Sequence, residues 1–326
     1  MKVIFVIFSF FAVFFTACET DFNVNAEWEE TAVVYGLLDA GRVLQQVKIS
    51  KAFLGEMDAF QMAQYADSIN YDPDELDVKI YRWNSNNIED SVVLDEKRII
   101  RDGEIFHDSI VVYEFANNEF IKKDFEYELV ITNKNSNNVV SSRTEIVTGF
   151  NFDISDSFKF GFVSNFDEDV SPYIVEYSSA SVKWGSNDNG KIYQLDLIFH
   201  YTENGLDDSL IFSQELVENT DNKISIEGEK FFNFLSLELN DTTFQGVREF
   251  VNLDLVMTVG SEDLETYIKV NKPITGITQQ RPPFTNINNG IGLFSSRFTK
   301  FRYDFDLTSK SKKFLTSVDG LDRNFQ

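Results

Sequence analysis

The chain has 326 residues, of which 43% are hydrophobic and 25% are charged, a composition that excludes an intrinsically disordered protein. Its 29 basic and 53 acidic residues give a formal net charge of −24, which repels nucleic acid and argues against DNA or RNA as a partner. A single cysteine and two histidines exclude an internal disulfide and a cysteine-based zinc site, and we expect neither a metal nor a cofactor.

The N-terminus has the pattern of an export signal. Lys2 precedes an apolar run from Val3 to Phe15, and the only cysteine of the chain, Cys18, follows the run closely. The run falls short of the roughly 20 apolar residues that a membrane-spanning helix needs, and it is typical of a secretory signal peptide. We therefore predict that residues 1–17 are cleaved.

The position of Cys18 resembles a bacterial lipobox, in which the cysteine is acylated and becomes the first residue of the mature protein. This resemblance implies a lipid anchor; the alternative is a secreted protein with an unmodified cysteine. Glu19 and Asp21 resemble the surface-export signal of Bacteroidetes lipoproteins, which implies the cell surface, while a periplasm-facing anchor stays the alternative. We interpret residues 18–30, which are mostly polar and acidic, as a lipidated tether.

The following segments predict a first β domain. Segments 31–38 and 42–50 are rich in apolar and β-branched residues, and the turn signal at Asp39–Gly41 between them predicts an opening hairpin. This domain is expected to cover residues 31–148. Its further predicted strands are 76–83, 91–94, 109–115, 125–132 and 139–147.

Residues 53–71 interrupt this series. Met57, Phe60, Ala63 and Ala66 recur at helical spacing, with Tyr65 beside them, which predicts a short amphipathic helix inserted into the β domain. Its apolar side either packs on the sheet or, as a candidate partner-binding loop, presents Phe60 and Tyr65 to another protein.

A second β domain is predicted from a boundary near Gly149 to the end of the chain, residues 149–326. Segment 261–272 is expected to include a short helix, and the Gly290 region precedes the final strand. The strands predicted in this domain are 173–184, 191–201, 209–217, 230–239, 249–259 and 298–307.

Composition and alternation together set the fold class. The chain has 33 Phe and 12 Tyr, and aromatic residues favour sheets. Leu76, Val78, Ile80 and Arg82 alternate with other residues, as they do in a strand with one buried face. We expect a mostly all-β protein with two β-sandwich-like domains.

No motif predicts catalysis. Segment Asn289–Gly292 lacks the third glycine and the lysine of phosphate-binding loops, and is expected to form a tight turn. Neither His107 nor His200 lies near a nucleophile elbow. Carboxylates are so abundant that some pair suited to hydrolysis will always be found. We therefore expect no catalytic residues.

The last thirty residues carry an excess of cations in an otherwise acidic chain. These side chains either pair internally with acidic residues or form a docking surface for an acidic partner or for lipid headgroups. Arg297, Lys300 and Arg302 are the candidate partner-binding residues of this group. The other cations are Lys310, Lys312, Lys313 and Arg323.

The segment Thr285–Phe294 resembles the C-terminal signature of a Bacteroidetes lipoprotein family catalogued as domain of unknown function 4249. The segments Val33–Leu38, Val47–Ser50, Asp77–Tyr81, Tyr127–Ile131 and Ile192–Leu195 follow the same family's order. The resemblance implies two β domains behind a lipid anchor, often near TonB-dependent outer-membrane receptors. It implies no catalytic residues.

These observations favour a non-enzymatic accessory or binding subunit of an outer-membrane complex, attached to the membrane by its lipid. A stand-alone glycan- or nutrient-binding surface lipoprotein is the alternative. A hydrolase is a third hypothesis, and it would need a pocket with two convergent, buried carboxyl groups.

Overall fold

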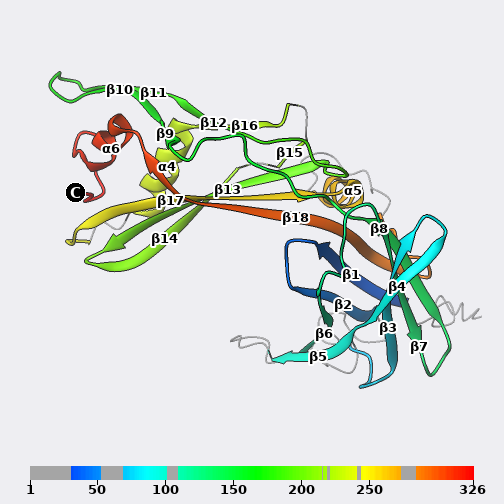
Figure 1. The fold of residues 1–326 in the computed structure, drawn as a ribbon. Coiled ribbons are helices and arrows are strands. Elements are labelled where there is room, and N and C mark those ends of the chain that lie inside the picture. The colour runs from blue at the N-terminus through cyan, green and yellow to red at the C-terminus, as the bar shows by residue number, and fades with distance from the viewer. Residues whose placement is uncertain are drawn as a thin grey trace, which may run out of the picture. The chain divides into compact units, whose positions relative to one another are not determined.

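A computed structural model describes residues 31–52, 69–100, 109–214, 216–218, 221–240, 244–272 and 284–326 (Figure 1). Within these ranges the chain is mostly strand with three short helices, which confirms the all-β, sandwich-like prediction. None of these helices has the length and apolar character that a membrane crossing requires. The predictions for Cys18, Glu19, Asp21, Phe60, Tyr65 and His107, and nearly all of the helix expected at 53–71, lie outside the described residues.

The largest element is a ten-stranded sheet in the order β14-β13-β17-β18-β1-β2-β6-β5, with β15 paired to β13 and β9 paired to β18. Its strands come from both halves of the chain. They are β1 (Thr31–Asp39), β2 (Leu44–Ala52), β5 (Asp95–Ile100), β6 (Ser109–Ala116), β9 (Lys159–Phe160), β13 (Ile192–Glu203), β14 (Leu206–Ser213), β15 (Val217–Glu218), β17 (Arg248–Gly260) and β18 (Gly290–Leu307).

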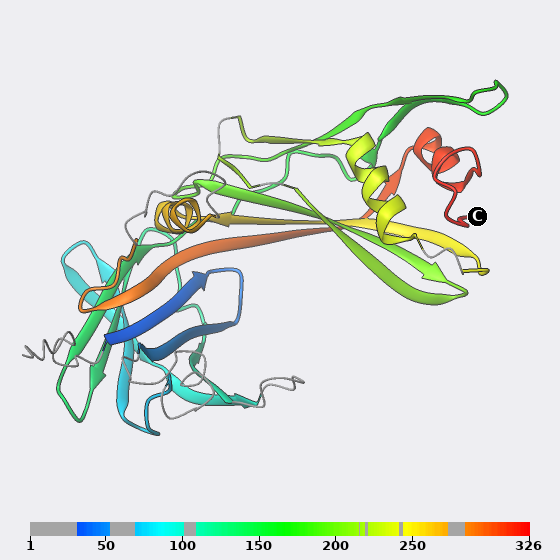
Figure 2. The same cartoon turned by 180° about the vertical axis from the view of Figure 1, so that it is seen from behind.

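Strand β18 changes partners along its length (Figures 1 and 2). Its first part pairs in parallel with β1, from Ala32 opposite Gly290 to Asp39 opposite Arg297. Its second part pairs antiparallel with β17, beginning where Arg297 lies opposite Gly260. The opening hairpin of β1 and β2 forms as predicted.

The first hydrophobic core lies between the β1-β2-β6 part of this sheet and a four-stranded sheet. Leu76, Val78 and Ile80 of β3 all point into this core, and Arg82 on the same face is 9% exposed and donates to the Phe120 carbonyl at 2.9 Å. The predicted alternation is therefore confirmed. The four-stranded sheet has the order β4-β3-β7-β8, with β3 (Leu76–Asn84), β4 (Asn87–Val93), β7 (Glu126–Asn133) and β8 (Val139–Glu145).

The second core packs on the inner faces of β13 and β17 and is dominated by aromatic rings. Helices α4 and α6 and two small sheets, β10-β11 and β12-β16, enclose it. These elements are β10 (Val163–Asp167), β11 (Ile174–Tyr177), β12 (Ser179–Lys183), β16 (Lys223–Glu227), α4 (Gly228–Glu238) and α6 (Ser309–Thr316).

The strand predicted at 230–239 is wrong, because this segment forms helix α4. Its aromatic content favoured a strand. However, the buried residues Phe231, Phe232 and Leu235 recur at helical spacing, and the segment has no β-branched residue to disfavour a helix. Gly228 starts the helix so close to the Phe162 carbonyl that a Cβ would lie 2.1 Å from that oxygen.

Two smaller predictions also need correction, whereas the strand expected at 91–94 agrees with the end of β4 at Val93. The strand expected at 173–184 is divided at Ser178 into β11 and β12. The last strand begins at Gly290 instead of residue 298, so Gly290 and Gly292 lie in a strand and not in a turn. Helix α6 was not predicted.

Residues 31–326 form one compact unit, although they contain two cores. Ile146 belongs to the first core and Val147 to the second, close to the boundary proposed near Gly149. The division into two domains stays a prediction.

Candidate functional site

Helix α5 (Glu262–Asn271) lies within the segment where a short helix was predicted and helps to form two cavities. It follows directly after β17, and Ser261 at its start hydrogen-bonds to Ser295 of β18 through their side chains. This contact holds the helix beside β18, near the residue at which β18 changes partners.

One cavity, which we call the arginine cavity, has a volume of about 450 Å³. Its lining includes Tyr35 and Leu37 of β1, Leu293 of β18, and Leu264 and Ile268 of α5. Leu264 and Ile268 are one helical turn apart and therefore share a face of α5. Most of the lining surface near the helix is therefore apolar, and the volume falls in the range of small-molecule sites.

The polar end of the arginine cavity is built from Asp39, Arg42 and Arg297. Asp39 is 2% exposed, and its Oδ1 accepts a hydrogen bond from the Gly41 amide at 2.9 Å. The Nε atoms of Arg42 and Arg297 lie 3.7 and 3.9 Å from the other carboxylate oxygen, Oδ2. The two guanidinium groups are therefore held beside one buried carboxylate.

Two of the facing atoms make no hydrogen bond among the described residues: Asp39 Oδ2 and Arg297 Nε are both buried and unsatisfied. An unsatisfied buried polar atom is costly, so it points to a partner or a change in geometry. The Arg42 and Arg297 side chains are 53% and 36% exposed, so their outer nitrogens remain accessible.

Two tyrosines also line the arginine cavity. Tyr267 of α5 and Tyr35 of β1 have their hydroxyl oxygens 3.3 Å apart, and their rings meet edge to face at 6.1 Å. The hydrogen bond with Tyr35, together with burial, raises the pKa of Tyr267 to about 12. The Tyr267 hydroxyl therefore stays protonated at neutral pH and can donate or accept a hydrogen bond.

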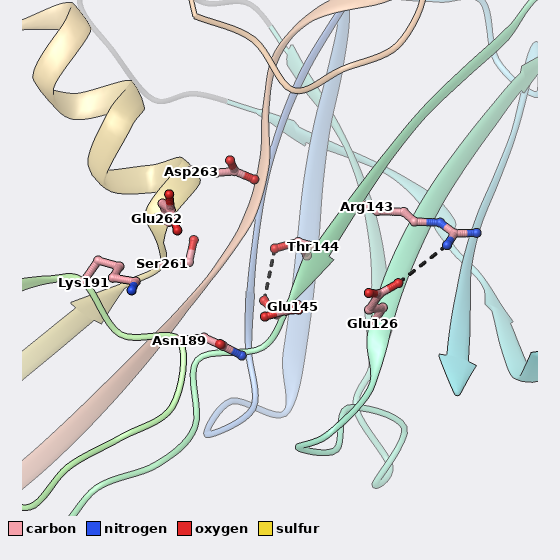
Figure 3. Close-up of a pocket in the computed structure, with 9 residues that line it drawn as sticks. All are labelled: Glu126, Arg143, Thr144, Glu145, Asn189, Lys191, Ser261, Glu262 and Asp263. Atoms are coloured by element: carbon pink, nitrogen blue, oxygen red, sulfur yellow. Dashed lines mark hydrogen bonds and ion pairs between the residues drawn. The ribbon is translucent and has the colours of Figure 1, made fainter. Parts of the chain in front are cut away.

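The second cavity, of about 390 Å³, lies at the start of α5 (Figure 3). Four carboxylates line it: Glu126 and Glu145 from the four-stranded sheet, and Glu262 and Asp263 from α5. Glu126 pairs with Arg143 at 3.5 Å, and Asp263 accepts from Asn286 at 2.8 Å.

These four carboxylates are exposed or half-exposed, not buried. General acid catalysis near neutral pH needs a carboxyl group whose pKa is raised, usually by burial. The cavity therefore lacks the convergent, buried carboxyl pair that the hydrolase hypothesis needs. In the described ranges, no three His, Cys, Asp or Glu side chains form a group that could hold a metal ion.

His200 lies on the outer face of β13. Its Nε2 is 2.9 Å from one carboxylate oxygen of Asp254, whose other oxygen accepts a hydrogen bond from the Asp304 amide. No serine or cysteine side chain shares a hydrogen bond with His200 among the described residues. The contact is therefore a cross-strand pair.

The C-terminal cations make mostly internal contacts. Arg302 pairs with Asp156 at 2.8 Å, and Lys313 pairs with Glu168 at 3.2 Å. Lys300 makes no ion pair with any residue that the structure describes. Of the three candidate partner-binding residues among these cations, Arg297 lines the arginine cavity, whereas Lys300 and Arg302 line neither cavity beside α5. A docking role for Lys300 and Arg302 stays a prediction.

Asp306 shows the structural use of these cations. It accepts hydrogen bonds from Lys159 at 2.7 Å and from Lys312 at 2.6 Å, joining β9 and α6 to the end of β18. Burial acts to raise the pKa of Asp306, but the hydrogen bonds from both lysines outweigh it and leave the pKa below the ordinary aspartate value.

Because the pKa of Asp306 is lower in the folded state, these ion pairs stabilise the body above the unfolded aspartate pKa of about 3.9. The stabilisation is lost as the pH falls through the folded pKa. The free energy of unfolding, measured by chemical denaturation, should therefore decrease less between pH 7 and pH 3 in Asp306→Asn than in the wild type. Asp319→Asn, at an exposed position, is the control and should follow the wild type.

The sequence indicated only part of the arginine cavity. Arg297 stood out through the cation excess, whereas Asp39 was interpreted only as a turn residue and Arg42 as the start of a strand. The cavity depends on the parallel pairing of β1 with β18, and no local sequence signal predicts this pairing.

The comparisons with known proteins add no family. A scan against protein-family models finds no match to the chain, and no curated protein matches it.

Proposed function

We propose that this protein is a lipid-anchored, non-enzymatic binding subunit of an outer-membrane complex. The observation that carries the proposal is the apolar run from Val3 to Phe15, followed by the only cysteine of the chain at Cys18. Two or more acyl chains on one residue give stable membrane attachment. The resemblance to the Bacteroidetes lipoprotein family, with its frequent TonB-dependent neighbours, supports an outer-membrane partner.

The body fits a binding role better than a catalytic one. The carboxylates that line the second cavity are exposed or half-exposed, and His200 pairs across strands. The arginine cavity, in contrast, combines apolar walls with guanidinium donors. Such a combination is typical of ligand recognition.

Replacing the cysteine tests the anchor directly. Cys18→Ser removes the thiol that would carry the lipid, so the variant should incorporate no clickable fatty acid in cells. Thr20→Ala changes a neighbouring residue without touching the thiol and should label like the wild type. Equal labelling of the Cys18→Ser variant would contradict a lipid on this residue.

Native purification tests the partner. After extraction in mild detergent, the wild-type protein should co-purify with an outer-membrane receptor that mass spectrometry identifies. A strictly monomeric protein without such a receptor would count against the accessory role. Protease treatment of intact cells determines which side of the membrane the body faces. It therefore tests the surface-export signal proposed at Glu19 and Asp21.

A stand-alone glycan- or nutrient-binding lipoprotein is the second candidate. It is favoured by one observation, the pair Tyr35 and Tyr267 beside the charged end of the arginine cavity. A monomer that binds a small ligand tightly would select this candidate over the accessory role.

A further inference from the structure

We infer that the arginine cavity binds a small monocarboxylate with an apolar body. The cavity has a charged end and an apolar wall, and each part has its own argument. The inference depends neither on the lipid at Cys18 nor on a receptor partner, because it uses only side chains of the folded body.

The charge of the polar end selects an anion. Among the described residues that line the cavity, Arg42 and Arg297 are the only cations and Asp39 is the only anion, so this end keeps one uncompensated positive charge. The rest of the chain is strongly acidic, with a net charge of −24. One excess positive charge matches a monoanion, whereas a phosphate dianion would leave the site negative.

The geometry of the arginines selects a planar anion. A guanidinium group presents parallel N–H donors that match the two oxygens of a carboxylate. The Asp39 Oδ2 atom lies 3.7 and 3.9 Å from the inner Nε atoms of the two arginines and makes no hydrogen bond to either Nε. It thereby positions the groups without using their outer donors, which leaves those donors for a ligand.

The walls of the cavity select an apolar body. Leu37 and Leu293 belong to the sheet, while Leu264 and Ile268 belong to α5. No residue of α5 is fully buried, so the helix leaves its apolar side chains only half-covered. A ligand that covers them gains about 25 cal/mol for each Å² of apolar surface removed from water.

The ligand chemistry has two sources, an aliphatic acid and the C-terminal carboxylate of an apolar peptide. The test uses the full-length lipoprotein in phosphatidylcholine nanodiscs and isothermal titration calorimetry, with titration of empty nanodiscs subtracted. Octanoate represents the aliphatic acid, N-acetylphenylalanine represents the peptide terminus, and octanamide is the uncharged match for octanoate. At least one of the two carboxylates should bind. If octanoate binds, octanamide should bind at least about tenfold more weakly.

Substitutions locate the binding. Arg297→Gln and Arg42→Gln should each weaken carboxylate binding by about tenfold or more, since each removes charge-assisted donors. Lys300→Gln, on the same strand as Arg297 but outside the cavity lining, should bind like the wild type. If Arg297→Gln fails to fold, Arg42→Gln carries the test, because its side chain is 53% exposed in the β1–β2 turn.

Binding by octanoate alone assigns an aliphatic acid, and binding by N-acetylphenylalanine alone assigns a peptide terminus; either result supports the inference. Three results would overturn it. They are no binding of either carboxylate, binding of octanamide and octanoate with equal affinity, and a loss of carboxylate affinity in Lys300→Gln as large as that in the two arginine variants. None of these outcomes affects fatty-acid labelling or receptor co-purification, so the inference and the proposed function fail separately.

Discussion

Phe231→Ala should lower the free energy of unfolding by about 3–5 kcal/mol. Phe231 is fully buried in helix α4 and contacts several other rings of the second core. Its ring stacks on Phe162 with the centroids 4.4 Å apart, and it meets Phe212 edge to face at 5.5 Å. Truncation removes both the buried apolar area and these ring contacts, and leaves a cavity between a helix and the sheet.

Chemical denaturation of the purified protein measures this loss. Leu237→Ala is the matched control, since Leu237 lies in the same helix but is 74% exposed. Its effect should stay within about 0.5 kcal/mol, as is usual for surface substitutions. Similar denaturation midpoints for the two variants would show that α4 does not depend on Phe231 for its packing.

Gly292→Ala should destabilise the body by about 3 kcal/mol or more, although it adds a single methyl group. Gly292 lies in β18 opposite Val34 of β1, with φ at +118°. An added Cβ would lie 2.0 Å from the Val34 carbonyl oxygen, a backbone atom that cannot move without disturbing the pairing. The substitution therefore combines a strained backbone with a direct clash.

Gly205→Ala separates these two causes. Gly205 has φ at +81° in the turn between β13 and β14, and a Cβ there would meet nothing within 4 Å. Its cost should be the conformational part alone, about 1–2 kcal/mol. Denaturation curves of both variants give the difference, which measures the clash with β1. Equal losses would mean that the approach of β1 to Gly292 is unimportant for stability.

Local patterns predicted the strands well where one face is buried. In β3 the alternation of Leu76, Val78 and Ile80 is a direct consequence of the period of two, and the structure buries all three. In α4 the same logic failed, because a short run dense in Phe and Leu fits either period. The β-propensity of the phenylalanines favoured a strand, whereas packing of the segment against the sheet that contains β13 stabilises a helix.

The candidate site was harder to predict than the fold. Asp39 and Arg42 belong to a turn that looks ordinary in sequence, and Arg297 is one of several late cations. They meet only because Asp39 lies opposite Arg297 in the β1–β18 register. A pairing between the first described strand and the last depends on the whole intervening fold, so periodicity and composition contain no information about it.

The partner change of β18 also dictates an order of events. β1 can pair with β2 as soon as both have been synthesised, but its other edge stays open until Gly290–Arg297 arrive. Closing so long a loop is entropically costly and slows folding, because the stabilising contacts between β1 and β18 form only after the two strands meet. A chain that ends before β18 would leave β1 and β17 with exposed edges, the kind of surface that aggregates. The arginine cavity is thus among the last features to form. A ligand can bind in it only after β18 has paired with β1.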